Sequence, residues 1–185
     1  MNEDFSQVSQ NNDQVIVPIQ QMVVFELDKE EYAVPITEVQ EVVKIPEITP
    51  VPQSPKFILG IMNLRGKIIP ILDLEKRFNL MVENKGVPEH IIVTEDSKGT
   101  PFGIQVDKVA EVLKIPQNSI QPSPKMITNK ISAEYLKGVA VIKRGVSERV
   151  LLIIDLEKLL TAEDLEGIQK VIVPTPKEER AHLVS

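Results

Sequence analysis

Residues 39–46 read VQEVVKIP, and residues 109–116 read VAEVLKIP. A constant offset of 70 residues relates the two stretches, and the match extends back to residues 32 and 102. Over residues 32–46, six of fifteen positions are identical in the second copy. Internal repetition of this kind indicates a duplicated structural unit. We therefore expect two copies of one small fold.

The repeat continues towards the C-terminus with growing offsets. Residues 73–76 read DLEK and recur at residues 155–158, an offset of 82, while Gly60 pairs with Gly138 at an offset of 78. The second copy is therefore expected to carry extra residues before Gly138 and in the hairpin that follows it.

Short apolar runs rich in β-branched residues and broken by Pro and Gly fill the region between the two ends of the chain. Such runs predict strands, and they are too short and too closely spaced for alternating strands and helices. Pro70 lacks an N–H, so its strand is expected to be an edge or bulged strand. The predicted strands are residues 22–27, 32–35, 41–45, 60–64 and 68–72 in the first copy and residues 91–94, 102–106, 111–115, 139–142 and 150–154 in the second.

The predicted fold class is mostly β, with two five-stranded subdomains related by duplication. A small sheet with many apolar strands leaves exposed edges, and closure into a barrel removes them. Two barrels side by side would leave a groove between them. One continuous sandwich is the alternative. Residues 37–40 and 74–78 are expected to form short helices, and a capping pattern at residues 161–164 predicts a C-terminal helix.

These expectations divide the chain into five parts. The sequence leaves open whether strands are exchanged between the two halves. The parts are a disordered N-terminal extension over residues 1–20, a first β-subdomain over 21–85, a second over 86–160, a C-terminal helix over 161–172 and a tail over 173–185.

Composition disfavours several classes of function. The 185 residues carry a net charge of −6 and contain no block of basic residues, which disfavours nucleic acid as a partner. There is no cysteine, so thiolate chemistry and disulfides are excluded. No basic leader precedes an apolar stretch, and no apolar run approaches the ~20 residues that span a bilayer. We therefore expect a cytoplasmic protein.

Repeated carboxylates are the candidates for catalysis or metal binding. In one interpretation they form an acid–base pair or a metal site. In the other, Asp73 and Asp155 end a strand and cap a short helix, a role that would be duplicated together with the fold. His90 and His182 have no evident catalytic partner, so we expect no catalytic residue, cofactor or metal. The repeated acids are Asp73, Glu75, Asp155 and Glu157.

The segment Asn63, Leu64, Arg65 and Gly66 predicts a tight hairpin, because glycine tolerates positive φ. A plain turn with a solvated arginine is one interpretation. A binding site is the other, because arginine is enriched among residues that dominate interfaces.

Residues 60–74 read GIMNLRGKIIPILDL, which resembles the core motif of the CheW family of chemotaxis adaptors. Residues 31–34 (EYAV), 39–42 (VQEV), 48–52 (ITPVP) and 102–109 (FGIQVDKV) are similar to other parts of that family. The resemblance runs in register over about residues 21–165 and leaves no room for a receiver or kinase segment.

The resemblance implies two SH3-like barrels and a non-enzymatic adaptor. It also implies two partners, the regulatory domain of the histidine kinase CheA and the cytoplasmic tip of chemoreceptors, in arrays at the inner face of the membrane. The family positions Val39, Glu41, Gly60 and Arg65 would contact partners. Apolar anchors for a receptor helix are expected at Val39, Val42, Val109 and Val112, and the full predicted partner-binding set adds Asn63, Leu64 and Gly66.

Three other functions remain open from the sequence. The chain would be a binding module of another signalling array, a metal-dependent hydrolase that uses the repeated carboxylates, or a structural protein of paired barrels that assembles with itself. An adaptor is expected to be largely monomeric when alone, and to insert into no membrane.

Overall fold

The computed structural model describes residues 16–81, 86–123 and 131–172. Each of the ten predicted apolar runs coincides with a strand, and only Ile45 lies beyond the end of its strand. One further short strand, β9, was not predicted. The strands are β1 (Ile19–Leu27), β2 (Glu30–Pro35), β3 (Val39–Lys44), β4 (Ile58–Leu64), β5 (Lys67–Asp73), β6 (His90–Glu95), β7 (Pro101–Val106), β8 (Lys108–Pro116), β9 (Ile120–Gln121), β10 (Leu136–Arg144) and β11 (Ser147–Ile154).

Helical segments are short, as predicted, apart from the last. The C-terminal helix lies within the predicted range, and Thr161 and Asp164 form the expected capping box, each side chain accepting the other's backbone N–H. The helical segments are η1 (Ile36–Glu38), α1 (Leu74–Arg77), η2 (Gln117–Ser119), η3 (Ala133–Tyr135), η4 (Leu156–Lys158) and α2 (Ala162–Ile172).

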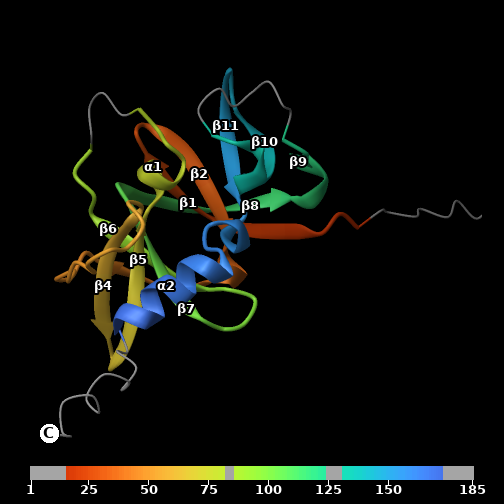
Figure 1. The fold of residues 1–185 in the computed structure, drawn as a ribbon. Coiled ribbons are helices and arrows are strands. Elements are labelled where there is room, and N and C mark those ends of the chain that lie inside the picture. The colour runs from red at the N-terminus through yellow and green to blue at the C-terminus, as the bar shows by residue number, and fades with distance from the viewer. Residues whose placement is uncertain (1–15, 82–85, 124–130, 173–185) are drawn as a thin grey trace, which may run out of the picture.

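The strands form two sheets, and each contains strands from both halves of the chain. One sheet, here barrel 1, has the order β3-β6-β7-β5-β4, and the other, barrel 2, has the order β8-β1-β2-β11-β10-β9. The first two strands of each sequence copy have thus joined the last three strands of the other copy. Neither barrel therefore corresponds to residues 21–85 or 86–160 alone, and the exchange that the sequence left open is present. Figure 1 shows β4 and β5 at one end of the molecule and β9 to β11 at the other.

Each sheet closes on itself through a continuation of its first strand. Beyond β3, Thr49 exchanges two backbone hydrogen bonds with Ile61 of β4, at 2.9 and 2.8 Å. Beyond β8, the short strand β9 pairs with β10 in the same way. Closure satisfies the edge groups that would otherwise be open to pairing with other chains. The fold is therefore two SH3-like β-subdomains, as predicted.

The Pro70 strand was predicted to be an edge or bulged strand. It is not an edge strand, and the bulge in its pairing with β4 lies on β4, between Ile58 and Gly60. β5 lies between β4 and β7 in barrel 1. The proline is tolerated because β7 pairs only with Ile71–Asp73, so Pro70 lies outside that paired stretch.

An apolar cluster fills the space between the barrels and is the largest of three clusters in the described residues. The interiors of barrel 1 and barrel 2 hold the two smaller clusters. The cluster between them takes side chains from both sheets, including the buried residues Phe25, Tyr32 and Phe102, and from α2 through Ile168. Burial of one such large side chain contributes ~1.5–3 kcal/mol. The two barrels are therefore expected to fold as one cooperative unit.

Arg77 joins both barrels to the C-terminal helix. Its guanidinium lies over the ring of Phe57, 4.4 Å from the centroid, and 5.3 Å from that of Tyr135. It also forms an ion pair with Asp164 of α2 at 3.8 Å. Phe57 precedes β4 of barrel 1 and Tyr135 precedes β10 of barrel 2, so one side chain contacts three parts of the fold.

The predicted extension and tail lie largely outside the described residues. Residues 1–15 and 173–185 are not described. The extension was predicted to reach residue 20, and this boundary is wrong because Ile19 and Gln20 already pair with Pro116 and Ile115 in barrel 2.

Candidate functional site

The hairpin between β4 and β5 is a rigid two-residue turn. Arg65 and Gly66 have φ values of +52° and +84°, and the flanking residues Leu64 and Lys67 pair with each other. Two successive positive φ values characterise a type I′ turn, whose twist matches that of the strands. The side-chain oxygen of Asn63 accepts the Gly66 N–H at 2.9 Å, which fixes the turn further.

Arg65 extends from this turn and pairs with Glu41 on β3. The distance from its Nη2 to the Glu41 Oε2 is 2.9 Å, and the arginine side chain is 78% exposed while that of the glutamate is 26% exposed. The structure thus brings together four predicted site residues, Glu41, Asn63, Arg65 and Gly66. An ion pair this exposed contributes at most ~1 kcal/mol to stability. Because the arginine side chain is 78% exposed, much of its guanidinium stays open to solvent.

Leu64 lies beneath the turn. It is half-buried and packs against the apolar interior of barrel 1. A hollow of about 200 Å³ opens here at the end of barrel 1, which we call mouth 1. Its lining residues are Gln40, Glu41, Leu64, Arg65, Lys67, Ile69, Glu95, Gly99 and Pro101.

The four predicted valine anchors divide into two pairs. Val39 and Val109 are half-buried and pack against the cluster between the barrels. Val42 and Val112 are 39% and 52% exposed. The expectation of an open groove between the barrels is wrong, because this cluster fills the space that the groove would occupy. Of these four valines, only Val42 and Val112 present substantial apolar surface to solvent.

Gly60 lies at a bulge in β4 and is buried. A Cβ atom there would lie 2.8 Å from the carbonyl carbon of Thr49 and closer still to its oxygen. Gly138, at the matching bulge in β10, would place a Cβ 2.7 Å from the carbonyl oxygen of Gln121. Both glycines therefore permit the close approach that closes a barrel. A Gly60→Asp substitution would therefore disturb barrel closure, so it cannot serve as a test of partner binding.

The repeated carboxylates include two helix caps, as one of the two interpretations predicted. Asp73 Oδ1 accepts the Lys76 N–H at 3.1 Å, and Asp155 Oδ1 accepts the Glu157 N–H at 3.2 Å. Within residues 16–81, 86–123 and 131–172, no group of three or more His, Asp or Glu side chains is placed to hold a metal ion. The acids recur because the capped turn after β5 recurs after β11.

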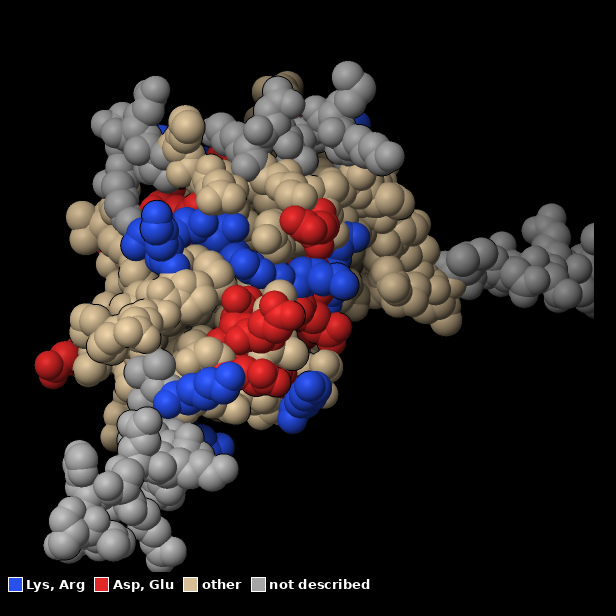
Figure 2. Space-filling view, viewed as in Figure 1, with Lys and Arg blue, Asp and Glu red and all other residues tan. Residues whose placement is uncertain are grey.

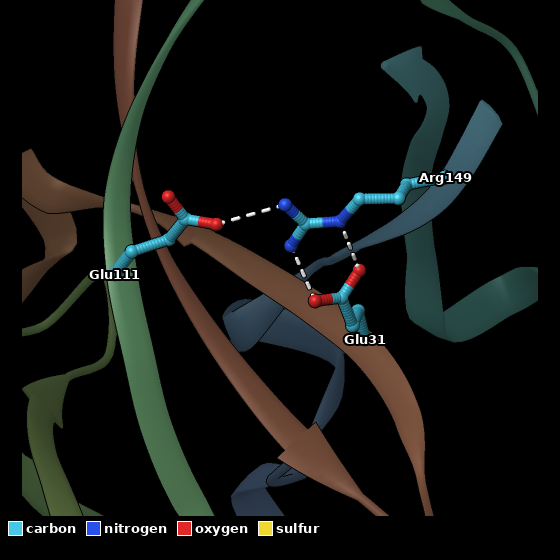
Figure 3. A network of polar contacts seen from close by, with 3 residues as sticks. All are labelled: Glu31, Glu111 and Arg149. Carbon is cyan, nitrogen blue, oxygen red and sulfur yellow. Dashed lines mark hydrogen bonds and ion pairs between the residues drawn. The ribbon is translucent and has the colours of Figure 1, made fainter. Parts of the chain in front are cut away.

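A half-buried charge network in barrel 2 was missed by the sequence analysis (Figure 3). Arg149 of β11 donates from its Nε to Glu31 Oε2 at 2.7 Å and from its Nη1 to Glu111 Oε1 at 2.9 Å. Its Nη2 also donates to Glu31, so that pair is bidentate. The hydrogen bonds to Glu31 and Glu111 hold the pKa of Arg149 above its usual range, so the guanidinium stays charged.

The position of these residues along their strands is a signal that sequence reasoning can use. Arg149 lies two residues before Leu151, and Glu31 lies two residues before Ala33, both of which are buried in the interior of barrel 2. Because side chains alternate between faces of a strand, both charges belong to the inner face. Charges at inner-face positions of neighbouring strands indicate an internal ion pair at the end of a barrel.

On the face drawn in Figure 2, charges of both signs lie side by side. Figure 2 shows acidic and basic side chains in adjoining bands on the face that carries α2. In the described part of the chain, no helix is long and apolar enough to cross a membrane. Arg65, Val42 and Val112 are thus the exposed members of the predicted partner-binding set that offer a charge or an apolar side chain to solvent.

Comparisons with known proteins agree with this geometry. A family model described as the CheW-like domain matches residues 21–164. The chain is 37% identical over 154 residues to the chemotaxis protein CheW of Treponema pallidum, covering 80% of this chain and 86% of that protein. It is 34% identical over 153 residues to the chemotaxis protein CheW of Klebsiella aerogenes, covering 82% and 88% of the two chains.

One solved structure is similar throughout the barrels. It is the crystal structure of the scaffolding protein TtCheW from Thermoanaerobacter tengcongensis, with a TM-score of 0.70 and 38% sequence identity. The match covers 82% of this chain and 94% of that chain.

Proposed function

The chain belongs to the CheW-like domain family of chemotaxis scaffolds, and from this premise we propose that it couples chemoreceptors to the histidine kinase CheA. The coupling uses non-covalent contact alone. One surface binds the cytoplasmic tip of a receptor and another binds the regulatory domain of the kinase, within arrays at the inner face of the membrane.

The observation that carries this proposal is the preorganised arginine of the β4–β5 hairpin. The type I′ turn and the Asn63 hydrogen bond hold the backbone, and Arg65 stays 78% exposed. A rigid loop loses little conformational entropy on binding. An exposed guanidinium on such a loop is well suited to be a residue that dominates an interface.

The duplicated fold supports the proposal of two partners, because it offers two related surfaces. The fold presents two related barrels, and an exposed valine stands at the equivalent place on each, Val42 on β3 and Val112 on β8. These valines flank the filled space between the barrels. We propose that they receive apolar side chains of a receptor helix, which binds across this rim rather than in a groove.

Binding by such a surface is expected to be modest and reversible. Signalling contacts bury roughly 1,000–1,600 Å², and a few residues supply most of the affinity. Because affinity rests on few residues, single substitutions are sufficient to test the site.

Arg65→Ala tests the proposal. We expect it to weaken binding of a receptor-tip fragment or of the CheA regulatory domain by roughly 5- to 100-fold, because removal of such an arginine costs about 1–3 kcal/mol. The measurement is isothermal titration of each purified partner into wild type and variant. Lys143→Ala is the matched control, since Lys143 is a 76% exposed cation on the corresponding hairpin of barrel 2.

Thermal unfolding of each variant should match that of wild type, because both side chains are exposed. If Arg65→Ala binds both partners as tightly as wild type does, the hairpin is not the contact site. If wild type binds neither partner, the adaptor function is wrong.

A further inference from the structure

The strand-pairing registers of the two barrels correspond residue by residue. In each barrel one valine is paired with a glutamate on one neighbouring strand and with a small residue on the other. The sets are Val24 with Glu111 and Ala33 in barrel 2, and Val93 with Glu41 and Gly103 in barrel 1. Glu41 therefore occupies in barrel 1 the place that Glu111 occupies in barrel 2.

The same superposition extends to the neighbouring parallel pair of strands. Ile153 pairs with Ala33 in barrel 2, and Ile71 pairs with Gly103 in barrel 1. Arg149 and Lys67 each lie four residues before the paired isoleucine of their strand. Glu31 and Pro101 each lie two residues before the paired small residue. Lys67 stands in the place of Arg149, and Pro101 stands in the place of Glu31.

The end of barrel 2 is closed by its own side chains, whereas mouth 1 is not. In barrel 2, Arg149 is held by Glu31 and Glu111. In mouth 1 the cation of Lys67 is exposed, and within the described residues it forms no ion pair. Glu31, which accepts hydrogen bonds from Arg149 through both of its carboxylate oxygens, has no counterpart in mouth 1, because Pro101 carries no charge.

A hollow lies at the place of the missing carboxylate. Mouth 1 encloses about 200 Å³, and both Lys67 and Pro101 line it. This is the space of several water molecules at about 30 Å³ each, which is enough for the side chain of a glutamate.

The charged side chains around mouth 1 attract an anion more strongly than those at the equivalent end of barrel 2. Glu41 is already paired with Arg65, and Glu95 accepts a hydrogen bond from the Gln40 amide at 2.6 Å. Lys143, on the corresponding hairpin of barrel 2, is paired with Glu148, whereas Arg65 lines mouth 1. Mouth 1 also lacks the anion that Glu31 supplies in barrel 2. The donors that remain are Lys67 and the exposed part of the Arg65 guanidinium.

We propose that mouth 1 receives an acidic side chain of a protein partner, whose carboxylate is bound by Lys67 and Arg65. It takes the place that Glu31 fills within barrel 2. The inference rests on the proposed function for the partner's identity, whereas the site is defined by this chain alone.

Pro101→Glu is the variant that tests the site most directly. It supplies the missing carboxylate from within the chain and should occupy the hollow by pairing with Lys67. Barrel 2 already carries this arrangement, because Glu26 lies directly opposite Glu31 as Glu95 lies opposite residue 101. Pro101→Gln is the matched control, since it restores the same backbone N–H and has nearly the same shape without the charge.

The first experiment needs no partner. N-acetylglutamate N-methylamide is titrated into ¹⁵N-labelled protein at low salt, with N-acetylglutamine N-methylamide as the neutral probe. We expect saturable shifts at the amides of Gly66, Lys67 and Gly99 with the acidic probe, retained in Pro101→Gln and abolished in Pro101→Glu. Equal shifts with the neutral probe, or no difference between the two variants, would overturn the proposal.

The second experiment uses a receptor-tip fragment and the CheA regulatory domain. For at least one of them, Pro101→Glu should bind roughly fivefold more weakly than Pro101→Gln, the loss expected for one exposed ion pair. Equal binding of both fragments by the two variants overturns the inference and leaves the adaptor function standing. If wild type binds neither fragment, the adaptor function fails, and the first experiment still decides whether mouth 1 binds a carboxylate.

Discussion

At the scale of a residue, Gly60 and Gly138 allow the two barrels to close because neither has a Cβ atom. Both lie at bulges, and both face a backbone carbonyl of the segment that closes their barrel. A methyl group at either position would push that segment away. Since the segment supplies the last hydrogen bonds of the ring, the cost includes lost pairing as well as steric strain.

Gly60→Ala is therefore expected to destabilise the protein by about 3 kcal/mol or more, since backbone atoms cannot move aside cheaply. Gly66→Ala should cost only about 1 kcal/mol, because its φ is +84° but its Cβ would contact nothing within 4 Å. Urea unfolding followed by circular dichroism measures both.

Gly167→Ala is the control for these two variants. This residue lies in α2 with open space around it, so alanine should stabilise the protein by about 0.5–1 kcal/mol. Equal unfolding midpoints for Gly60→Ala and Gly66→Ala would show that Gly60 is not essential to barrel closure.

Arg77 acts at the scale of elements, because it fixes α1, α2 and both barrels relative to one another. Its guanidinium lies over Phe57 and Tyr135 and pairs with Asp164. Its side chain is only 15% exposed, so these contacts are weakly screened by solvent. A planar cation is required, since a lysine ammonium cannot lie flat against two rings.

Arg77→Ala should lower the free energy of unfolding by about 1–3 kcal/mol through the loss of these contacts. Arg77→Lys should lose roughly half as much, because it keeps the charge near Asp164 but not the planar stacking. The measurement is urea unfolding, with aromatic proton shifts of Tyr135 as a local probe. A lysine variant as stable as wild type would show that charge alone matters here.

The elements themselves were predictable because their signals are local. The β-branched runs located the strands, and Asp73 and Asp155 located the caps of the turns that follow β5 and β11. The Arg65–Gly66 pair also predicted its turn correctly. Each of these depends on residues a few positions apart, so a single sequence contains the information.

The pairing of strands that lie far apart in the chain could not be predicted from the sequence. Glu31 and Arg149 are 118 residues apart. Strand alternation places each charge on an inner face, but nothing near either residue shows that the two strands are neighbours. The same holds for the exchange of strands, because a pair of apolar strands fits either of two equivalent barrels. Duplication makes the two barrels alike, so the choice rests on chain connectivity and packing between the barrels.

At the scale of the whole molecule, the exchange makes each half of the chain depend on the other. β1 and β2 complete barrel 2, and β6 and β7 complete barrel 1. The apolar cluster between the barrels also takes side chains from both halves. A duplicated protein of this kind cannot be divided at the sequence repeat.

We therefore expect residues 16–85 and 86–172, produced as separate chains, to be unfolded when alone. Mixing them should restore the native circular dichroism spectrum in a 1:1 complex, because all strand pairs can then form. A half that unfolds cooperatively by itself would contradict the exchanged pairing. Joining the two pieces again through the native peptide bond provides the positive control.

Simultaneous binding of two partners by one chain is the central claim, and sedimentation velocity tests it most directly. The mixture contains this protein, a receptor-tip fragment and the CheA regulatory domain, each also run alone and in pairs. The account predicts a species that contains all three components and sediments faster than either pair. Mutual exclusion of the two partners, or failure of either to sediment with this chain, would contradict it.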